Sequence, residues 1–104
     1  MENKSKVETF IGFCIRAKKC KIGTNAVATY KKADLVIACC TASENTKKEA
    51  QKFAVKFNCP LLITRERKLE EFTHKENAKV MAIADASLAK AILDNSEKDF
   101  IARD

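Results

Sequence analysis

The clearest chemical signal in the chain is a lysine-rich stretch around a glycine, within residues 18–32. Three of the four residues 18–21 are lysines, and Gly23 is one of only two glycines. Thr24 or Asn25 could cap the free N–H groups of a helix that starts there. The N–H groups and dipole of a helix start attract anions, so the flanking lysines indicate phosphate binding. The alternative is an ordinary solvated basic helix.

The cysteines are a weaker indication of function than the lysine-rich stretch. There are five, with one histidine and no C-x-x-C pair, so no zinc-ligand spacing is present. Free cysteines in a reducing compartment usually behave as small buried hydrophobes, and we interpret Cys14 and Cys39 in this way. Cys20, between Lys19 and Lys21, is the one candidate for a lowered thiol pKa. We predict no metal and no cofactor.

Length and charge indicate one basic domain spanning residues 1–104. The formal net charge is +6, with 12 basic and 5 acidic residues in 1–56 against 8 and 9 in 57–104. Such a positive first half favours a polyanionic partner, most often nucleic acid. The longest apolar run, residues 35–40, is too short to cross a bilayer, and no signal-peptide core is visible. We therefore expect a cytoplasmic protein without a membrane partner.

Hydrophobic periodicity predicts alternating helices and short strands. For example, Val7, Phe10, Ile11 and Cys14 follow helical spacing, whereas residues 35–39 form a continuous apolar run typical of a buried strand. The predicted helices cover about residues 5–18, 24–32, 43–57, 68–72 and 87–93, and the predicted strands 35–39, 61–64 and 80–84. A charged tail follows at about 95–104, from which Phe100 and Ile101 could dock on the core. This order predicts the α/β class, a three-layer α/β/α sandwich with a small mixed, largely parallel sheet.

Three segments carry a family resemblance. They are residues 11–19 followed by Gly23, residues 41–48 (Thr-Ala-Ser-Glu-Asn-Thr-Lys-Lys) after a buried strand, and the strand 80–84 followed by Asp-Ala-Ser-Leu-Ala-Lys. Together they resemble the bacterial YlxQ-like proteins, of the kink-turn-binding ribosomal-protein superfamily that includes archaeal large-subunit protein seven-Ae. The resemblance covers roughly residues 7–94.

The resemblance implies an α/β/α fold without enzymatic activity. It also implies an RNA site at the start of the second helix plus the loop after the last strand. The archaeal signature at that helix is Gly-x-Asn-Glu-x-x-Lys, whose polar side chains read guanine edges. Gly23 and Asn25 match it, whereas Ala26 and Thr29 stand where the glutamate and the lysine would be.

We therefore predict a monomeric, non-enzymatic RNA-binding protein whose partner is ribosomal or other structured RNA, with the ribosome as one candidate. Gly23, Thr24 and Asn25 would approach the RNA backbone and bases, Arg16, Lys19, Lys21 and Lys32 would contact phosphates, and Asp85, Ala86 and Ser87 would line the far side of the site. The alternative is a protein-interaction domain of the same fold that has lost kink-turn reading, as Ala26 and Thr29 would permit.

Overall fold

The computed structural model describes residues 6–64, 68–75, 78–95 and 100–103. The predicted start of the first helix at residue 5 and part of the predicted tail, residues 96–99 and 104, lie outside the described residues. The elements in chain order are α1 (Lys6–Ala17), β1 (Cys20–Ile22), α2 (Thr24–Val27), β2 (Leu35–Ala38), α3 (Glu44–Phe57), β3 (Leu61–Thr64), α4 (Leu69–Thr73), β4 (Val80–Ile83), α5 (Ala86–Asp94) and β5 (Phe100–Arg103).

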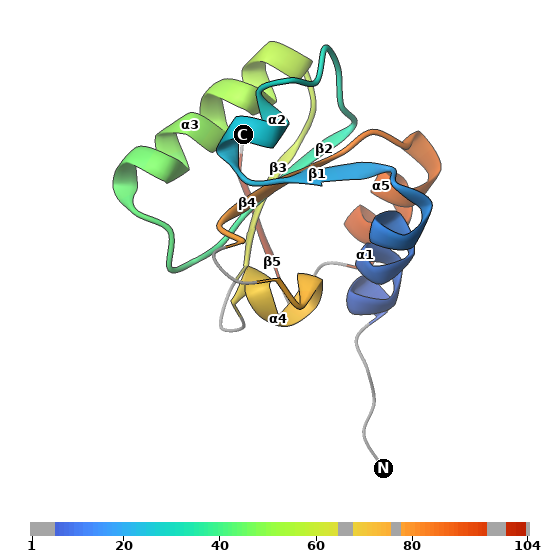
Figure 1. Cartoon of the computed structure of the whole chain (residues 1–104). Coiled ribbons are helices and arrows are strands. Elements are labelled where there is room, and N and C mark those ends of the chain that lie inside the picture. Colours follow the sequence, from blue (N-terminus) through green and yellow to red (C-terminus); the bar gives the residue numbers. More distant parts are fainter. Residues whose placement is uncertain (1–5, 65–67, 76–77, 96–99, 104) are drawn as a thin grey trace.

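Helices cover both faces of one sheet, which makes three layers (Figure 1). The side chains of β2 alternate between the two cores: Leu35 and Ile37 pack with residues of α1, α4 and α5, whereas Val36 and Ala38 pack with residues of α2 and α3. This period of two explains why the strand reads as a continuous apolar run, because both of its faces are buried. The predicted α/β sandwich is confirmed.

The sheet is mixed, but the prediction that it is largely parallel is wrong. The strand order is β1-β4-β2-β3-β5, and among these described strands β2 and β3 pair in parallel whereas the other three pairings are antiparallel. The connection from β2 to β3 contains the 14-residue helix α3, about 21 Å long, which returns the chain along the sheet so that the two strands pair in parallel. β4 instead enters the sheet antiparallel to β2.

Three elements differ from the sequence prediction. Cys20–Ile22 form the edge strand β1, which was not predicted. The second helix ends at Val27 instead of near residue 32. Within the predicted tail, Phe100–Arg103 form strand β5, which pairs with β3. No helix in the described parts of the chain has both the length and the apolar composition needed to cross a membrane.

Candidate nucleic-acid interface

The start of α2 is built on a glycine that follows β1. Gly23 has φ 95° and ψ 148°, a conformation that side-chain-bearing residues rarely adopt. Its N–H donates to the Val80 carbonyl oxygen at 2.8 Å, so the turn is tied to the first residue of β4. Gly23 is also the N-cap of α2, and it makes no side-chain cap. The prediction that Thr24 or Asn25 caps this helix is therefore wrong. The first N–H groups of a helix have no intrahelical partner, and here no side chain of the N-cap residue satisfies them.

These N–H groups border an open groove of about 460 Å³, which we call the α2 groove. It collects the first residues of α2, one residue from the first turn of α3 and the chain that enters β4. Its lining residues are Ile22, Gly23, Thr24, Asn25, Ala26, Thr46, Lys79 and Val80. Three of the predicted RNA-binding residues, Gly23, Thr24 and Asn25, are thus brought together here. Asn25 is exposed, so its amide is available to a ligand.

Lys79 is the lysine that lines the groove, but its ammonium group already interacts with two other side chains. Its Nζ lies 3.0 Å from Glu70 Oε2 and donates to Thr41 Oγ1 at 2.9 Å. Sequence reasoning missed Lys79, because its place beside Gly23 depends on the antiparallel pairing of β4 with β1, a strand that was not predicted. A ligand at this groove meets a lysine that is held in place rather than a free cation.

The predicted phosphate contacts do not gather at the α2 groove. Lys21 lies on β1 with its Nζ 5.4 Å from the centroid of the Tyr30 ring. The Lys19 carbonyl accepts from Ala84 N at 2.8 Å, which places Lys19 at the opposite end of β4. Lys32 lies near that same end, because Asp34 N, two residues later, donates to the Ile83 carbonyl at 2.7 Å.

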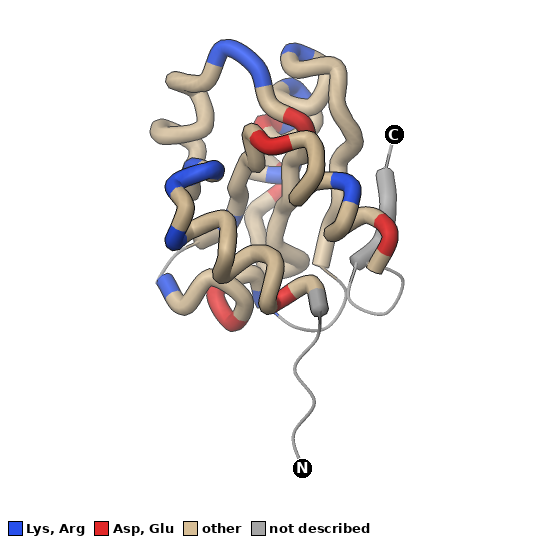
Figure 2. The backbone as a smooth tube through the Cα atoms, turned by 90° about the vertical axis from the view of Figure 1, so that its right-hand side faces the viewer, with Lys and Arg blue, Asp and Glu red and all other residues tan. Residues whose placement is uncertain are grey.

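The fourth predicted contact, Arg16, is exposed in the last turn of α1. From the side of α1 and α5, Lys and Arg positions are seen at separate places along the chain with acidic positions between them (Figure 2).

The predicted second half of the site, Asp85, Ala86 and Ser87, is also displaced. Because β1 and β4 are antiparallel, with Ile22 opposite Met81 and Cys20 opposite Ile83, Gly23 adjoins the beginning of β4. Asp85 follows the other end of β4, five residues or about 17 Å of extended chain beyond Val80. The Asp85 carboxylate accepts from Leu88 N at 2.9 Å as the N-cap of α5. The prediction that this loop lines the far side of the α2 site is therefore wrong, and the chain before β4 takes that place.

Cys14 and Cys39 are buried as predicted, but the prediction that Cys20 has the lowered thiol pKa is wrong. Burial raises the pKa of Cys20, and the charge of Lys75 only partly opposes this, so Cys20 is not the lowered thiol. At the buried Cys39, desolvation also raises the pKa, but hydrogen bonds and the Lys79 charge outweigh it and the net shift is downward. Cys39 Sγ lies 3.0 Å from Thr41 Oγ1 and accepts from Leu69 N at 3.3 Å. Cys39 therefore joins the start of α4 to the residues that hold Lys79.

Comparison with known proteins supports the fold. No protein-family model matches the chain, and no curated protein matches it. A solved structure of a protein with unknown function from Bacillus halodurans is similar, with a TM-score of 0.71 and 22% sequence identity. The similarity covers 88% of this chain and 96% of that chain. At this level of identity it shows a shared α/β sandwich and nothing further.

Proposed function

We propose that this protein is a non-enzymatic RNA-binding domain that contacts structured RNA through the α2 groove. The observation that carries the proposal is the open groove in which the uncapped first turn of the four-residue helix α2 lies beside the exposed Asn25. The positive first half of the chain supports a polyanionic ligand. The resemblance of residues 7–94 to kink-turn-binding proteins points to RNA with sheared G·A pairs.

The chemistry of the groove suits both parts of a nucleotide. Backbone N–H groups and the Thr24 hydroxyl can donate to phosphate oxygens, while the Asn25 amide offers two donors and one acceptor to a base edge. Lys79, held by Glu70 and Thr41, adds a positioned donor at the groove. Single-stranded or distorted RNA presents such edges more openly than a regular A-form helix does. Bulged or kinked RNA is therefore the expected substrate class.

The basic residues outside the groove take a secondary role in this proposal. Arg16, Lys19 and Lys32 are exposed and would attract the RNA over a longer range. If several phosphates are neutralised, log K should fall against log[salt] with a slope of about −0.7 to −0.9 per phosphate. The five free cysteines fit a cytoplasmic location, where thiols stay reduced.

The test compares two RNAs at one fixed salt concentration. One contains a kink-turn with sheared G·A pairs, and in the other those pairs are replaced by Watson–Crick pairs. We expect the kink-turn RNA to bind at least tenfold more tightly, and Asn25→Ala to remove most of that difference. Asn95→Ala is the matched control, since Asn95 is exposed and its amide bonds locally to the Ala91 carbonyl. Equal affinity for both RNAs would contradict the proposal of kink-turn reading.

One feature favours the alternative, a protein-interaction domain that does not read kink-turns. Ala26 lines the groove at the position of the family glutamate, so a charged acceptor for a guanine edge is missing there. This alternative predicts weak binding to both RNAs with no effect of Asn25→Ala.

A further inference from the structure

We propose that the outer face of α3 docks an acidic, amphipathic protein segment, at a surface separate from the α2 groove. This surface, the α3 docking face, comprises the side chains that line an open hollow on the solvent side of the helix: Lys48, Gln51, Lys52, Val55 and Lys56. The inward side of the same helix is occupied by buried Ala50, Phe53, Ala54 and Phe57. The docking face is therefore not needed to hold α3 on the sheet.

The exposure of Val55 is the observation that indicates a binding partner. Its side chain is 80% exposed, which makes it one of two exposed large hydrophobic residues among those described. A β-branched residue is less favourable in a helix than lysine, glutamate or alanine. Neither helix propensity nor core packing explains its presence at this position. Burial against a second molecule would explain why a valine stands there.

The surroundings of Val55 define the charge of that molecule. Lys48, Lys52 and Lys56 repeat every four residues, so they form one stripe along the helix next to Val55. The aliphatic stems of such lysines can extend an apolar floor. The Lys56 ammonium lies 5.5 Å from the centroid of the Phe57 ring, so Lys48 and Lys52 supply most of the positive rim. The Lys52–Glu49 contact, at 3.9 Å between exposed side chains, neutralises little of this charge. An apolar centre with a positive rim is complementary to an apolar side chain flanked by carboxylates.

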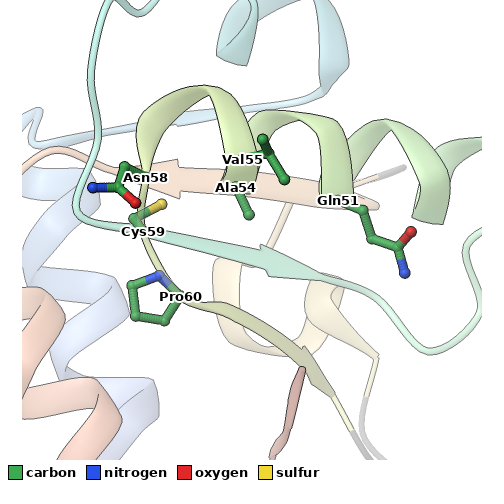
Figure 3. Close-up of a pocket in the computed structure, with 6 residues that line it drawn as sticks. All are labelled: Gln51, Ala54, Val55, Asn58, Cys59 and Pro60. Atoms are coloured by element: carbon green, nitrogen blue, oxygen red, sulfur yellow. The ribbon is translucent and has the colours of Figure 1, made fainter. Parts of the chain in front are cut away.

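The surface continues beyond the docking face, which gives room for a peptide segment. A second hollow shares Gln51 and Val55 with the first and continues past the end of α3 to Asn58, Cys59 and Pro60 (Figure 3). Its lining comes from the last turns of the helix and the turn that leads to β3 (Figure 3). An extended or helical segment could follow this path with successive side chains.

RNA is the less suitable occupant of this face. Sequence-tolerant binding of single-stranded nucleic acid relies on aromatic platforms for base stacking. The two aromatic residues of α3, Phe53 and Phe57, are buried on the opposite side. The α2 groove takes only Thr46 from the first turn of α3, whereas Val55, the apolar centre of the docking face, lies about 14 Å further along the helix. The domain could thus hold an RNA and an acidic protein at the same time.

The test uses a synthetic helical peptide with leucines along one face and glutamates on both sides of them. A scrambled peptide of the same composition and a short oligouridine serve as comparison ligands. Binding is followed by chemical-shift changes in isotope-labelled full-length protein. We expect the amphipathic peptide to shift residues of the second half of α3 and to bind at least tenfold more tightly than the scrambled one.

Matched variants then assign the contact. Val55→Ser should weaken peptide binding at least fivefold, whereas Phe13→Ser, at an α1 residue 52% exposed, should leave it unchanged. Lys52→Gln should weaken it, and Lys90→Gln on α5 should not. Asn25→Ala should leave peptide binding intact, which separates this result from the RNA proposal. Absence of peptide binding, equal binding of the scrambled peptide, insensitivity to Val55→Ser, or oligouridine competing for this face would each overturn the inference.

Discussion

The N–H of Gly23 donates to the Val80 carbonyl oxygen at 2.8 Å, and this bond fixes the start of α2 against the beginning of β4. The left-handed turn at Gly23 and the open groove beside it both depend on this arrangement. Because Lys79 directly precedes Val80, the bond also sets the distance between the uncapped helix start and the nearest held lysine.

Gly23→Ala should therefore lower the free energy of unfolding by about 1–3 kcal/mol, the usual cost of forcing a side chain into this backbone region. A Cβ at Gly23 would meet no atom within 4 Å, so the cost arises from backbone strain and not from a clash. RNA affinity should fall as well if α2 starts at the binding site. Urea unfolding and RNA titration of the same variant measure both effects.

Gly12→Ala provides the matched control. Gly12 lies inside α1, and a Cβ there would make only an ordinary contact, 3.6 Å from Arg16 Nη1. The substitution should stabilise the protein by roughly 0.5–1 kcal/mol, because alanine loses less backbone entropy in a helix. Unchanged stability of Gly23→Ala would mean that the turn relaxes into another conformation.

Asp85 should behave as a helix cap and not as an RNA contact. Asp85→Ala removes the acceptor for Leu88 N and should cost about 1 kcal/mol of stability while leaving RNA affinity unchanged. Asp85→Asn should keep most of the stability, since asparagine caps about as well. Thermal unfolding and RNA titration of the pair check this. A large loss of RNA affinity in Asp85→Asn would show that this loop belongs to the RNA-binding site.

The sequence was sufficient to predict those helices and strands whose side-chain pattern is strong. The spacing of Ala50, Phe53, Ala54 and Phe57 predicts α3, and in the structure Ser43 accepts from Thr46 N as its N-cap. β1 was missed because its three residues, Cys20 to Ile22, stand among lysines and are too few to show a period. Its place in the sheet comes from backbone pairing with β4, which leaves no trace in side-chain pattern.

The candidate site was only partly predictable for the same reason. Gly23, Thr24 and Asn25 are consecutive, so any fold keeps them together. Whether the α2 start adjoins the chain before β4 or the loop after it depends on the direction of β4. The side-chain pattern of residues 80–84 gives no direction, and a predicted short helix at residues 68–72 does not set it either. Exposure of Val55 could be read from its helical phase, opposite to Phe53 and Phe57.

Cys39 should contribute more to stability than its size suggests. Cys39→Ala and Cys14→Ala remove the same atoms from equally buried positions. Cys39→Ala also leaves Leu69 N, at the start of α4, without its sulfur acceptor. We expect it to cost about 1–3 kcal/mol more than Cys14→Ala, the penalty for an unsatisfied buried N–H. Urea unfolding of both variants at pH 7 gives the comparison, and equal costs would show that water or a backbone shift satisfies Leu69.

The stability of the protein should fall above pH 9 because of Cys14. Burial, with smaller contributions from Cys20 and Asp85, raises the pKa of the Cys14 thiol from 9.0 to about 12. Between pH 9 and pH 12 the unfolded chain loses this proton and the folded chain keeps it. The contribution of Cys14 to the free energy of unfolding is therefore fully present below pH 9 and declines as pH rises. At pH 10.5 the contribution of Cys14 to this loss should reach about 2 kcal/mol relative to pH 8. Burial also raises the pKa of the Cys59 thiol to about 11, so Cys59 adds a loss of its own.

The cost of Cys14→Ala measured by urea unfolding should therefore shrink by about that 2 kcal/mol between pH 8 and pH 10.5, since the variant lacks the titrating thiol. Cys39→Ala is the control of opposite sign. The pKa of Cys39 is lowered in the folded state, so its contribution is present above pH 9 and is lost as pH falls through the folded value. The cost of Cys39→Ala should accordingly grow as pH rises toward 9. A pH-independent cost for Cys14→Ala would show that its thiol ionises equally in the folded and unfolded chains.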